Sequence, residues 1–253
     1  MAVTRLGLLS PLHELPGEVQ DVAAAARPPV ALWQVITASS DDHSLPALRA
    51  TADTAALTDG ARRLARWRPD AVAWACTSGS FVVGRAGALE HLAAIEAAAA
   101  APATSTSLAF AEALDALGID EVVAVAPYPE PAAAAFAAFL GELGVVVSAT
   151  VPLGCAGPSA SERLDAAAVA AALERVGDGV PVLLADTAVW GIEIHAELAP
   201  RLAAPLLVAN QVTLWHALGL AGADTDIAAL GVLAGVPAGY RTRPGRKAGG
   251  AVR

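Results

Sequence analysis

Residues 71–80 read AVAWACTSGS, and this stretch decides how the rest of the chain is interpreted. Its first six residues, Ala71–Cys76, form the continuous apolar run that is typical of a strand buried on both faces of a parallel sheet. In open parallel sheets, ligands bind beyond the carboxyl ends of the strands. The residues that follow the strand are therefore the first candidates for a site, and they are a thiol, three hydroxyl-bearing residues and a glycine: Cys76, Thr77, Ser78, Gly79 and Ser80.

Similar apolar runs alternate with alanine-rich stretches of helical period, which predicts an α/β fold with doubly wound character. The predicted strands are Arg5–Ser10, Pro29–Ile36, Ala71–Cys76, Glu121–Ala126, Val145–Val151, Pro181–Ala185 and Pro205–Val208. The predicted helices are Glu18–Ala26, Ala47–Arg66, Ala86–Ala101, Ser107–Leu117, Pro131–Leu143, Leu164–Val176, Gly191–Leu198 and Gln211–Leu220. Three glycines follow predicted helices at positions where a left-handed cap is expected, namely Gly118, Gly144 and Gly177.

The alternation of strands and helices occurs twice, which predicts two pseudo-symmetric Rossmann-like (flavodoxin-like) halves with parallel sheets and an active-site cleft between them. The first half comprises residues 1–104 plus 209–253 and carries Cys76. The second half comprises residues 105–208 and carries Asp186. Polar residues gather in four turns after strands: Pro11–Glu14, Cys76–Ser80, Pro127–Glu130 and Asp186–Ala188.

Composition excludes several classes of partner. A net charge of -9 argues against binding to nucleic acid or to an anionic membrane surface. No signal segment or apolar run of about 18 residues is present, so we expect a cytoplasmic protein with no membrane association. The two cysteines and five histidines lack metal-ligand spacing, so no metal is expected. The apolar helices leave room for a homodimer, and the basic end (Arg241, Arg243, Arg246, Lys247 and Arg253) is interpreted as a solubilising tail.

Cys76 has two interpretations from the residues alone. A cysteine after a strand is often a small core residue. At the start of the following helix, however, unpaired backbone N–H groups favour a thiolate and could hold a carboxylate. Other candidates have plainer interpretations: His13 as a backbone-bonded loop residue, Cys155 as a bystander, Asp41–His43 as a solvated loop, and His91, His195 and His216 as surface or lightly buried residues.

Residues 75–81, Ala-Cys-Thr-Ser-Gly-Ser-Phe, resemble the first-cysteine motif of bacterial maleate cis-trans isomerases, relatives of the arylmalonate decarboxylases in the Asp/Glu racemase superfamily. Pro127-Tyr128 and the segment Asn210–Trp215 resemble the same branch, so that the resemblance spans roughly residues 4–222. It implies a cofactor-free enzyme in which two cysteines, one from each half, act on a small carboxylic acid. Cys76 corresponds to the first cysteine, and Tyr128 with the Ser78–Ser80 turn corresponds to groups that hold carboxylate oxygens.

The chain departs from this pattern at two positions. Asp186 stands where the family has its second cysteine, and His13 and Glu14 occupy the turn where the family has an asparagine. We hypothesise that Asp186 replaces the second thiol as proton donor or base. Two carboxylates would repel a dianionic substrate, since unit charges 4 Å apart interact by about 4 kcal/mol at an effective dielectric near 20. Either one carboxyl is protonated, or the substrate is a monoacid, an amide or a molecule with a cationic group.

Three functions follow as hypotheses. The first is an isomerase similar to maleate isomerase, and the second is a decarboxylating lyase or an Asp/Glu-type racemase. The third is a non-catalytic protein that binds a small acid, for which an inert Cys76 thiol would be the sign. The expected substrate-binding residues are Thr77, Ser78, Gly79, Ser80, Tyr128, Thr187, Ala188, Glu14, His13 and Asn210, around catalytic Cys76 and Asp186.

Overall fold

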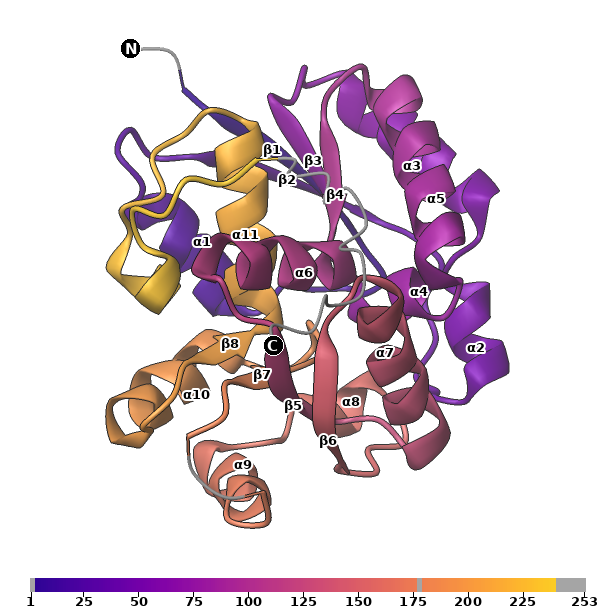
Figure 1. The fold of residues 1–253 in the computed structure, drawn as a ribbon. Helices are drawn as coiled ribbons and strands as arrows, with labels where there is room; N and C mark the ends of the chain where they lie inside the picture. Colours follow the sequence, from indigo (N-terminus) through magenta and orange to yellow (C-terminus); the bar gives the residue numbers. More distant parts are fainter. Residues whose placement is uncertain (1–2, 177–178, 240–253) are drawn as a thin grey trace, which may run out of the picture.

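Two parallel four-stranded sheets form the framework of the protein (Figure 1). The structure is a computed structural model that describes residues 3–176 and 179–239. The strand order is β2-β1-β3-β4 in one sheet and β6-β5-β7-β8 in the other, and every pairing is parallel. The two orders are the same when counted from each first strand, so the two halves share one topology. The predicted fold class is confirmed.

The elements alternate along the chain much as the apolar pattern predicts. The strands are β1 Arg5–Ser10, β2 Ala31–Ile36, β3 Ala71–Trp74, β4 Ala103–Ser105, β5 Glu121–Ala126, β6 Val146–Pro152, β7 Val182–Leu184 and β8 Leu206–Val208. The α-helices are α1 Gly17–Ala25, α2 Leu45–Ala50, α3 Thr54–Ala65, α4 Thr77–Phe81, α5 Gly84–Ala99, α6 Thr106–Leu117, α7 Glu130–Glu142, α8 Pro158–Ser161, α9 Ala166–Leu173, α10 Gly191–Leu198 and α11 Ala209–Leu220. Two 3₁₀ helices follow, η1 Ala199–Arg201 and η2 Ala228–Leu233.

Two element predictions are wrong. The segment 47–66 forms two helices because the Asp53 side chain accepts a hydrogen bond from Ala56 N at 2.8 Å and starts α3 anew. Strand β4 was not predicted, since its three residues, Ala103–Ser105, follow α5 too closely for an apolar run to show. Gly118 and Gly144 have the expected left-handed φ of 69° and 84°, whereas Gly177 lies outside the described residues.

Helix α11 lies where the two halves meet (Figure 1). It packs on β3 and β4 of the first sheet, on α6, and on β8 and α10 of the second half. All ten residues of Ala209–Leu218 are buried, and four of them are polar: Asn210, Gln211, Thr213 and His216. The predicted boundary after residue 104 falls inside β4, and the predicted boundary after 208 falls at the junction of β8 and α11. The division into halves at these residues stays a prediction.

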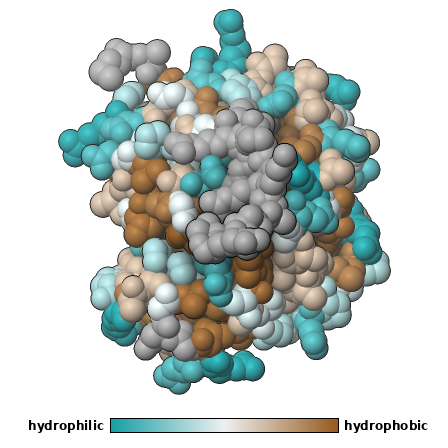
Figure 2. Space-filling view, viewed as in Figure 1, coloured by the Kyte–Doolittle hydropathy of each residue, from teal (hydrophilic) through white to brown (hydrophobic). Residues whose placement is uncertain are grey.

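The surface of the described residues is mixed. Figure 2 shows hydrophilic side chains around the margin of this face and hydrophobic residues exposed in several areas of it. Large exposed apolar side chains include Trp67, Leu89 and Val146. No described helix is long and apolar enough to cross a membrane. The basic residues of the predicted tail lie outside the described residues, and the homodimer stays a prediction.

Candidate active site

The turn after β3 places Cys76 at the N-cap of the short helix α4. The Cys76 Sγ accepts a hydrogen bond from Gly79 N at 3.3 Å and lies 3.8 Å from Ser78 Oγ and 3.9 Å from Thr51 Oγ1. Gly79 is required by packing, because a Cβ there would lie 2.8 Å from both Thr51 Oγ1 and the Trp74 ring. The glycine therefore lets its own N–H approach the sulfur.

Burial controls the protonation of this thiol. Cys76 is 2% exposed, and this desolvation raises the pKa of the thiol above its ordinary 9.0. Hydrogen bonds from Gly79, Ser78 and Thr51 oppose the rise, and the nearby charge of Asp186 adds to it. The Gly79 N–H favours the thiolate as expected, but desolvation raises the pKa of Cys76 by more than the donors lower it. The raised pKa favours the thiol over the thiolate at neutral pH.

The turn after β7 brings Asp186 to the same place from the other half. Asp186 has a left-handed φ of 78°, a conformation that aspartate tolerates better than most residues, and its Oδ1 accepts a hydrogen bond from Ala188 N at 3.1 Å. The Thr187 Oγ1 donates to Ala75 O at 3.4 Å, which ties this turn to the Cys76 turn. The two turns that the sequence singled out therefore meet.

Three buried polar atoms at this meeting point have no hydrogen-bond partner among the described residues: Thr77 Oγ1, Tyr128 Oη and Asp186 Oδ2. Burial, followed by the charges of Asp186 and Cys76, raises the pKa of Tyr128 well above 10.0, while the nearby Thr77 and Ser78 hydroxyls oppose this only partly. Tyr128 is therefore a neutral donor. Because buried polar groups are normally satisfied, unpaired ones that converge mark a place for a ligand.

His43 belongs to this group, and the interpretation of residues 41–43 as a solvated loop is wrong for it. His43 is 2% exposed, and its ring contacts Tyr128 edge-on with centroids 4.8 Å apart. Its Nδ1 lies 3.0 Å from Cys155 O, and its Nε2 lies 3.7 Å from Asp186 Oδ2. The available signal was its place in the loop after β2, at the same sheet edge as the four turns.

Two predicted binding residues have side chains that are engaged in supporting the turns. Ser80 Oγ donates to the carbonyls of Cys76 and Thr77, both at 3.0 Å, and accepts from Ser107 N at 3.3 Å. Asn210 Nδ2 donates to Glu18 Oε1 at 2.7 Å and to the carbonyls of Thr187 and Val189 at 3.2 and 3.1 Å. Both residues hold the backbone of the site.

Glu18 is a second buried carboxylate that sequence reasoning missed. It is 4% exposed, and its Oε2 accepts from Ile192 N at 2.9 Å and Glu193 N at 3.1 Å, in the first turn of α10. Burial raises the pKa of Glu18, although its three hydrogen bonds oppose the shift. The helical pattern of α1 indicates only that Glu18 is an acidic residue on the buried face of the helix.

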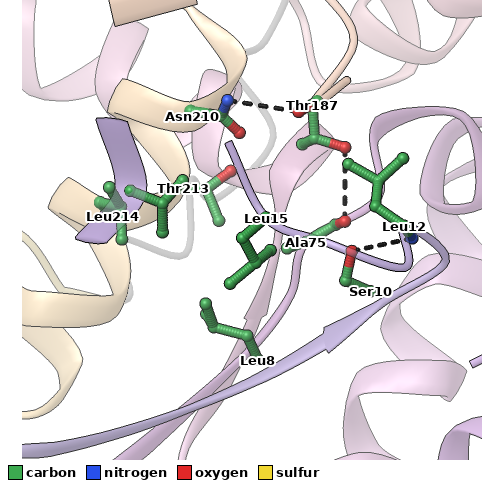
Figure 3. Close-up of a pocket in the computed structure, with 10 residues that line it drawn as sticks. Leu8, Ser10, Leu12, Leu15, Ala75, Thr187, Asn210, Thr213 and Leu214 are labelled. Carbon is green, nitrogen blue, oxygen red and sulfur yellow. Dashed lines mark hydrogen bonds between the residues drawn. The ribbon is translucent and has the colours of Figure 1, made fainter. Parts of the chain in front are cut away.

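A small apolar cavity of about 10 Å³ lies beside the two turns (Figure 3). Figure 3 shows apolar side chains from β1, the loop after it and α11 around this space, next to Ala75 and Thr187. The cavity has room for about one water or methyl group. Its lining residues are Leu8, Ser10, Leu12, Leu15, Val19, Ala75, Thr187, Asn210, Thr213 and Leu214.

A wider cleft of about 760 Å³ opens between the two halves. Ala188 lines it, as do the exposed side chains of His13 and Glu14. The expectation of two carboxylates together in a desolvated pocket is therefore wrong, because Glu14 is exposed and only Asp186 is buried. The exposed carboxylates Glu14, Asp41 and Glu162 line this cleft and are called the carboxylate rim below.

The remaining candidates lie elsewhere or act through their backbone. His216 is 1% exposed, against the prediction, and lies 2.7 Å from Thr104 Oγ1, and burial lowers its pKa to about 4. His91 and His195 are half-buried, as predicted. Cys155 is buried and meets the site through its carbonyl. Within residues 3–176 and 179–239, no group of His, Cys, Asp and Glu could hold a metal ion.

Comparison with known proteins gives one consistent result. The family model of arylmalonate decarboxylase matches residues 52–234. Arylmalonate decarboxylase from Bordetella bronchiseptica is 30% identical over 170 residues, covering 66% of this chain and 71% of that protein. A liganded double mutant of arylmalonate decarboxylase, with glycine changed to cysteine and cysteine to serine, is 26% identical with a TM-score of 0.75, covering 87% and 93%.

The fold is also that of a maleate isomerase. A cysteine-to-serine mutant of maleate cis-trans isomerase from Nocardia farcinica, with a covalently bound succinylcysteine intermediate, has a TM-score of 0.83. The match covers 92% of this chain and 99% of that chain at 20% identity. At this identity the likeness concerns the fold alone.

Proposed function

Because this chain belongs to the arylmalonate decarboxylase family, we propose that it is a cofactor-independent lyase that removes CO₂ from a small malonate-type acid. In this proposal Thr77 and Tyr128 hold the carboxylate that is retained, and Cys76 protonates the carbon that loses CO₂. The relatives at 26 and 30% identity are arylmalonate decarboxylases, whereas the maleate isomerase matches at 20%, which favours the lyase over the isomerase as first candidate.

The convergence of the buried Cys76 thiol with the unpaired hydroxyls of Thr77 and Tyr128 is the observation that carries the proposal. Loss of CO₂ breaks the bond between the α-carbon and one carboxylate, and its electron pair delocalises into the retained carboxylate as an enediolate. The Cys76 S–H then gives its proton to the α-carbon, and water reprotonates the sulfur. A thiol whose pKa is raised suits this step, because it keeps its proton until a basic carbon forms.

Neutral donors would carry the negative charge in this site. The buried polar and charged residues of the described chain include no lysine or arginine. Thr77 Oγ1 and Tyr128 Oη are unpaired and preorganised, as a developing oxyanion requires. Moving a diacid from water into this buried site costs desolvation free energy for both carboxylates. This cost falls when one carboxylate leaves as neutral CO₂.

The second candidate is an isomerase or racemase. Cys76 and Asp186 reach the site from different halves, which suits proton transfer at two faces of a substrate. An addition mechanism through Cys76 needs a thiolate, and the raised pKa of Cys76 disfavours it at neutral pH. Proton transfer to and from the α-carbon by Cys76 and Asp186 needs no resting thiolate, so racemisation remains the stronger form of this candidate.

The decisive experiment follows small acids in deuterated water by NMR: aryl- and alkylmalonates, maleate, aspartate, glutamate and hydantoins. We expect CO₂ release from a malonate, with one deuterium on the α-carbon, and loss of this activity in Cys76→Ala. Cys155→Ala is the matched control and should keep the activity. Maleate conversion without CO₂ would support the isomerase instead. If no acid in the panel incorporates deuterium, and Cys76→Ala behaves like the wild type, the enzyme proposal would be overturned in favour of a binding protein.

A further inference from the structure

We propose that His43 is a positioning residue that controls the proton on Asp186, so that the two side chains hold one proton between them at the face opposite Cys76. The inference rests on the racemase form of the proposed function, since that candidate assigns the Asp186 side of the site to proton transfer. It adds a residue that neither the sequence motif nor the family resemblance contains.

The first argument is the fixed tautomer of His43. Its Nδ1 lies 3.0 Å from the Cys155 carbonyl oxygen, which can only accept a hydrogen bond, so Nδ1 carries a hydrogen. The backbone N of His43 donates to Ala156 O at 2.7 Å, and the ring packs edge-on against Tyr128. The ring therefore has little freedom, and in its neutral form it directs the Nε2 lone pair at Asp186.

The second argument is the fixed orientation of Asp186. Its Oδ1 accepts from Ala188 N at 3.1 Å within the turn. Its Oδ2 has no hydrogen bond and lies 3.7 Å from His43 Nε2. A carboxylate oxygen and a ring nitrogen lone pair repel each other unless a proton lies between them. With both side chains less than a tenth exposed, a neutral pair that shares one proton avoids the cost of an isolated buried charge.

The proton balance is simple. In the racemase reaction, where Cys76 removes the α-proton at its own face, the shared proton leaves Oδ2 and forms the C–H bond on the Asp186 face of the carbanion, which leaves the pair with one negative charge. A proton from water at Nε2 then restores the pair. In the reverse direction, the Oδ2 carboxylate takes a proton from the α-carbon and His43 passes one to water. His43 thus acts through Asp186, and Asp186 acts on the substrate.

Two variants separate the contacts of His43. In His43→Asn the amide nitrogen takes the place of Nδ1 and keeps the bond to Cys155 O, whereas Asp186 loses its neighbour. In His43→Gln the amide reaches the position of Nε2 and can meet Asp186 Oδ2. We expect kcat to fall about 100-fold in His43→Asn and about 10-fold in His43→Gln, with KM changed by less than about 3-fold. His195→Gln, a half-buried histidine of α10, is the control and should leave both constants unchanged.

A ligand-free measurement keeps this inference separate from the proposed function. Side-chain ¹⁵N NMR of the whole protein should show a histidine in the Nδ1–H tautomer that is missing in both His43 variants. Its Nε2 signal should move in Asp186→Asn. The inference would be overturned, even in an active enzyme, if His43 were in the Nε2–H tautomer or if its Nε2 signal had the same chemical shift in Asp186→Asn. So would Cys76-dependent turnover with an unchanged kcat in His43→Asn. If no acid is turned over, the proposed function fails, and the NMR result alone decides whether His43 and Asp186 share a proton.

Discussion

At the scale of single residues, the site is governed by competition between burial and hydrogen bonding. The Gly79 N–H lowers the pKa of Cys76, as a helix start should, yet desolvation raises it by more. The same competition acts on Tyr128, whose hydroxyl is buried next to Asp186. The pKa of each group is therefore raised, which favours its protonated form at neutral pH.

The thiol of Cys76 should be slow to alkylate. Because its pKa is raised above 9.0, little thiolate is present at pH 7, and the rate with iodoacetamide should still be rising above pH 9. The measurement is mass spectrometry of the modified peptide in Cys155→Ser, which removes the other described thiol. A plateau in the rate below pH 8 would contradict this and would restore the thiolate needed for addition chemistry.

Removal of the unpaired hydroxyls should stabilise the folded protein and lower its catalytic activity. Thr77→Val and Tyr128→Phe each replace a buried hydroxyl that has no partner in the described structure. We expect the free energy of unfolding in urea to rise by about 1 kcal/mol in each variant, because a desolvated polar group is removed. The value of kcat/KM should fall about 100-fold.

Ser80→Ala is the contrasting variant, since the Ser80 hydroxyl is satisfied. Its removal leaves Ser107 N without this acceptor, so we expect a loss of about 1 kcal/mol of stability. Equal stability changes in the three variants would mean that the Thr77 and Tyr128 hydroxyls are not prepared for a ligand.

Sequence reasoning reached some site residues and not others, for a physical reason. Cys76, Tyr128 and Asp186 follow strands directly, so the rule for parallel sheets finds them. His43 and Glu18 acquire their roles from partners more than 100 residues away, Cys155 and Ile192. No local pattern encodes such a contact. For the same reason, the sequence did not show that Asn210 is engaged with Glu18.

At the scale of elements, the contact of α1 with α10 links the two halves. Glu18 on α1 accepts from two N–H groups in the first turn of α10, where a negative charge is favoured. It also accepts from Asn210 on α11, which holds the carbonyls of Thr187 and Val189. Three helices and the Asp186 turn are thus connected through one carboxylate.

Loss of this carboxylate should destabilise the fold. Glu18→Ala leaves the Ile192 and Glu193 N–H groups without this acceptor, and we expect the free energy of unfolding to fall by about 2 to 3 kcal/mol. The measurement is urea unfolding. Glu197→Ala is the control: this exposed residue forms an ion pair with Arg201 at 3.8 Å, and the substitution should cost less than about 0.5 kcal/mol.

The same carboxylate should make stability depend on pH. The pKa of folded Glu18 is raised above 4.5, so the folded state binds the proton more tightly than the unfolded state. Its contribution is fully present below pH 4.5 and declines as pH rises through the folded pKa. The unfolding free energy of the wild type minus that of Glu18→Gln should therefore decrease as pH rises across this window. An increase would show that the hydrogen bonds outweigh burial.

Element prediction succeeded for strands that form a continuous apolar run and failed where this local signal was missing or was overridden by a side chain. The strands β1 and β5 have the predicted bounds, and each is six residues long. β4 has three residues, and its burial comes from α5, α6 and α11. The helix predicted over residues 47–66 divides because the Asp53 side chain competes for a backbone N–H, and helical periodicity does not register this.

At the scale of the whole molecule, the repeated topology brings together two turns that carry different reactive groups. Each half contributes one turn after its third strand in chain order, β3 and β7, and the first supplies a thiol while the second supplies a carboxyl. The alternation in the sequence predicted this arrangement, because the carboxyl edges of two such sheets must face a common cleft. What it could not predict is the cleft's depth, since that depends on side chains from both halves.

The carboxylate rim has a consequence for how fast the protein finds its substrate. Glu14, Asp41 and Glu162 line the cleft between the halves of a protein whose net charge is -9, so an anionic acid that enters through this cleft would approach against an unfavourable potential. Dissolved ions weaken this long-range repulsion, so kcat/KM for an anionic substrate should increase between about 20 and 200 mM NaCl. Glu14→Gln together with Glu162→Gln should flatten that dependence, and a decrease with salt would mean that attraction dominates. Encounter with the substrate would then be slowest in dilute buffer.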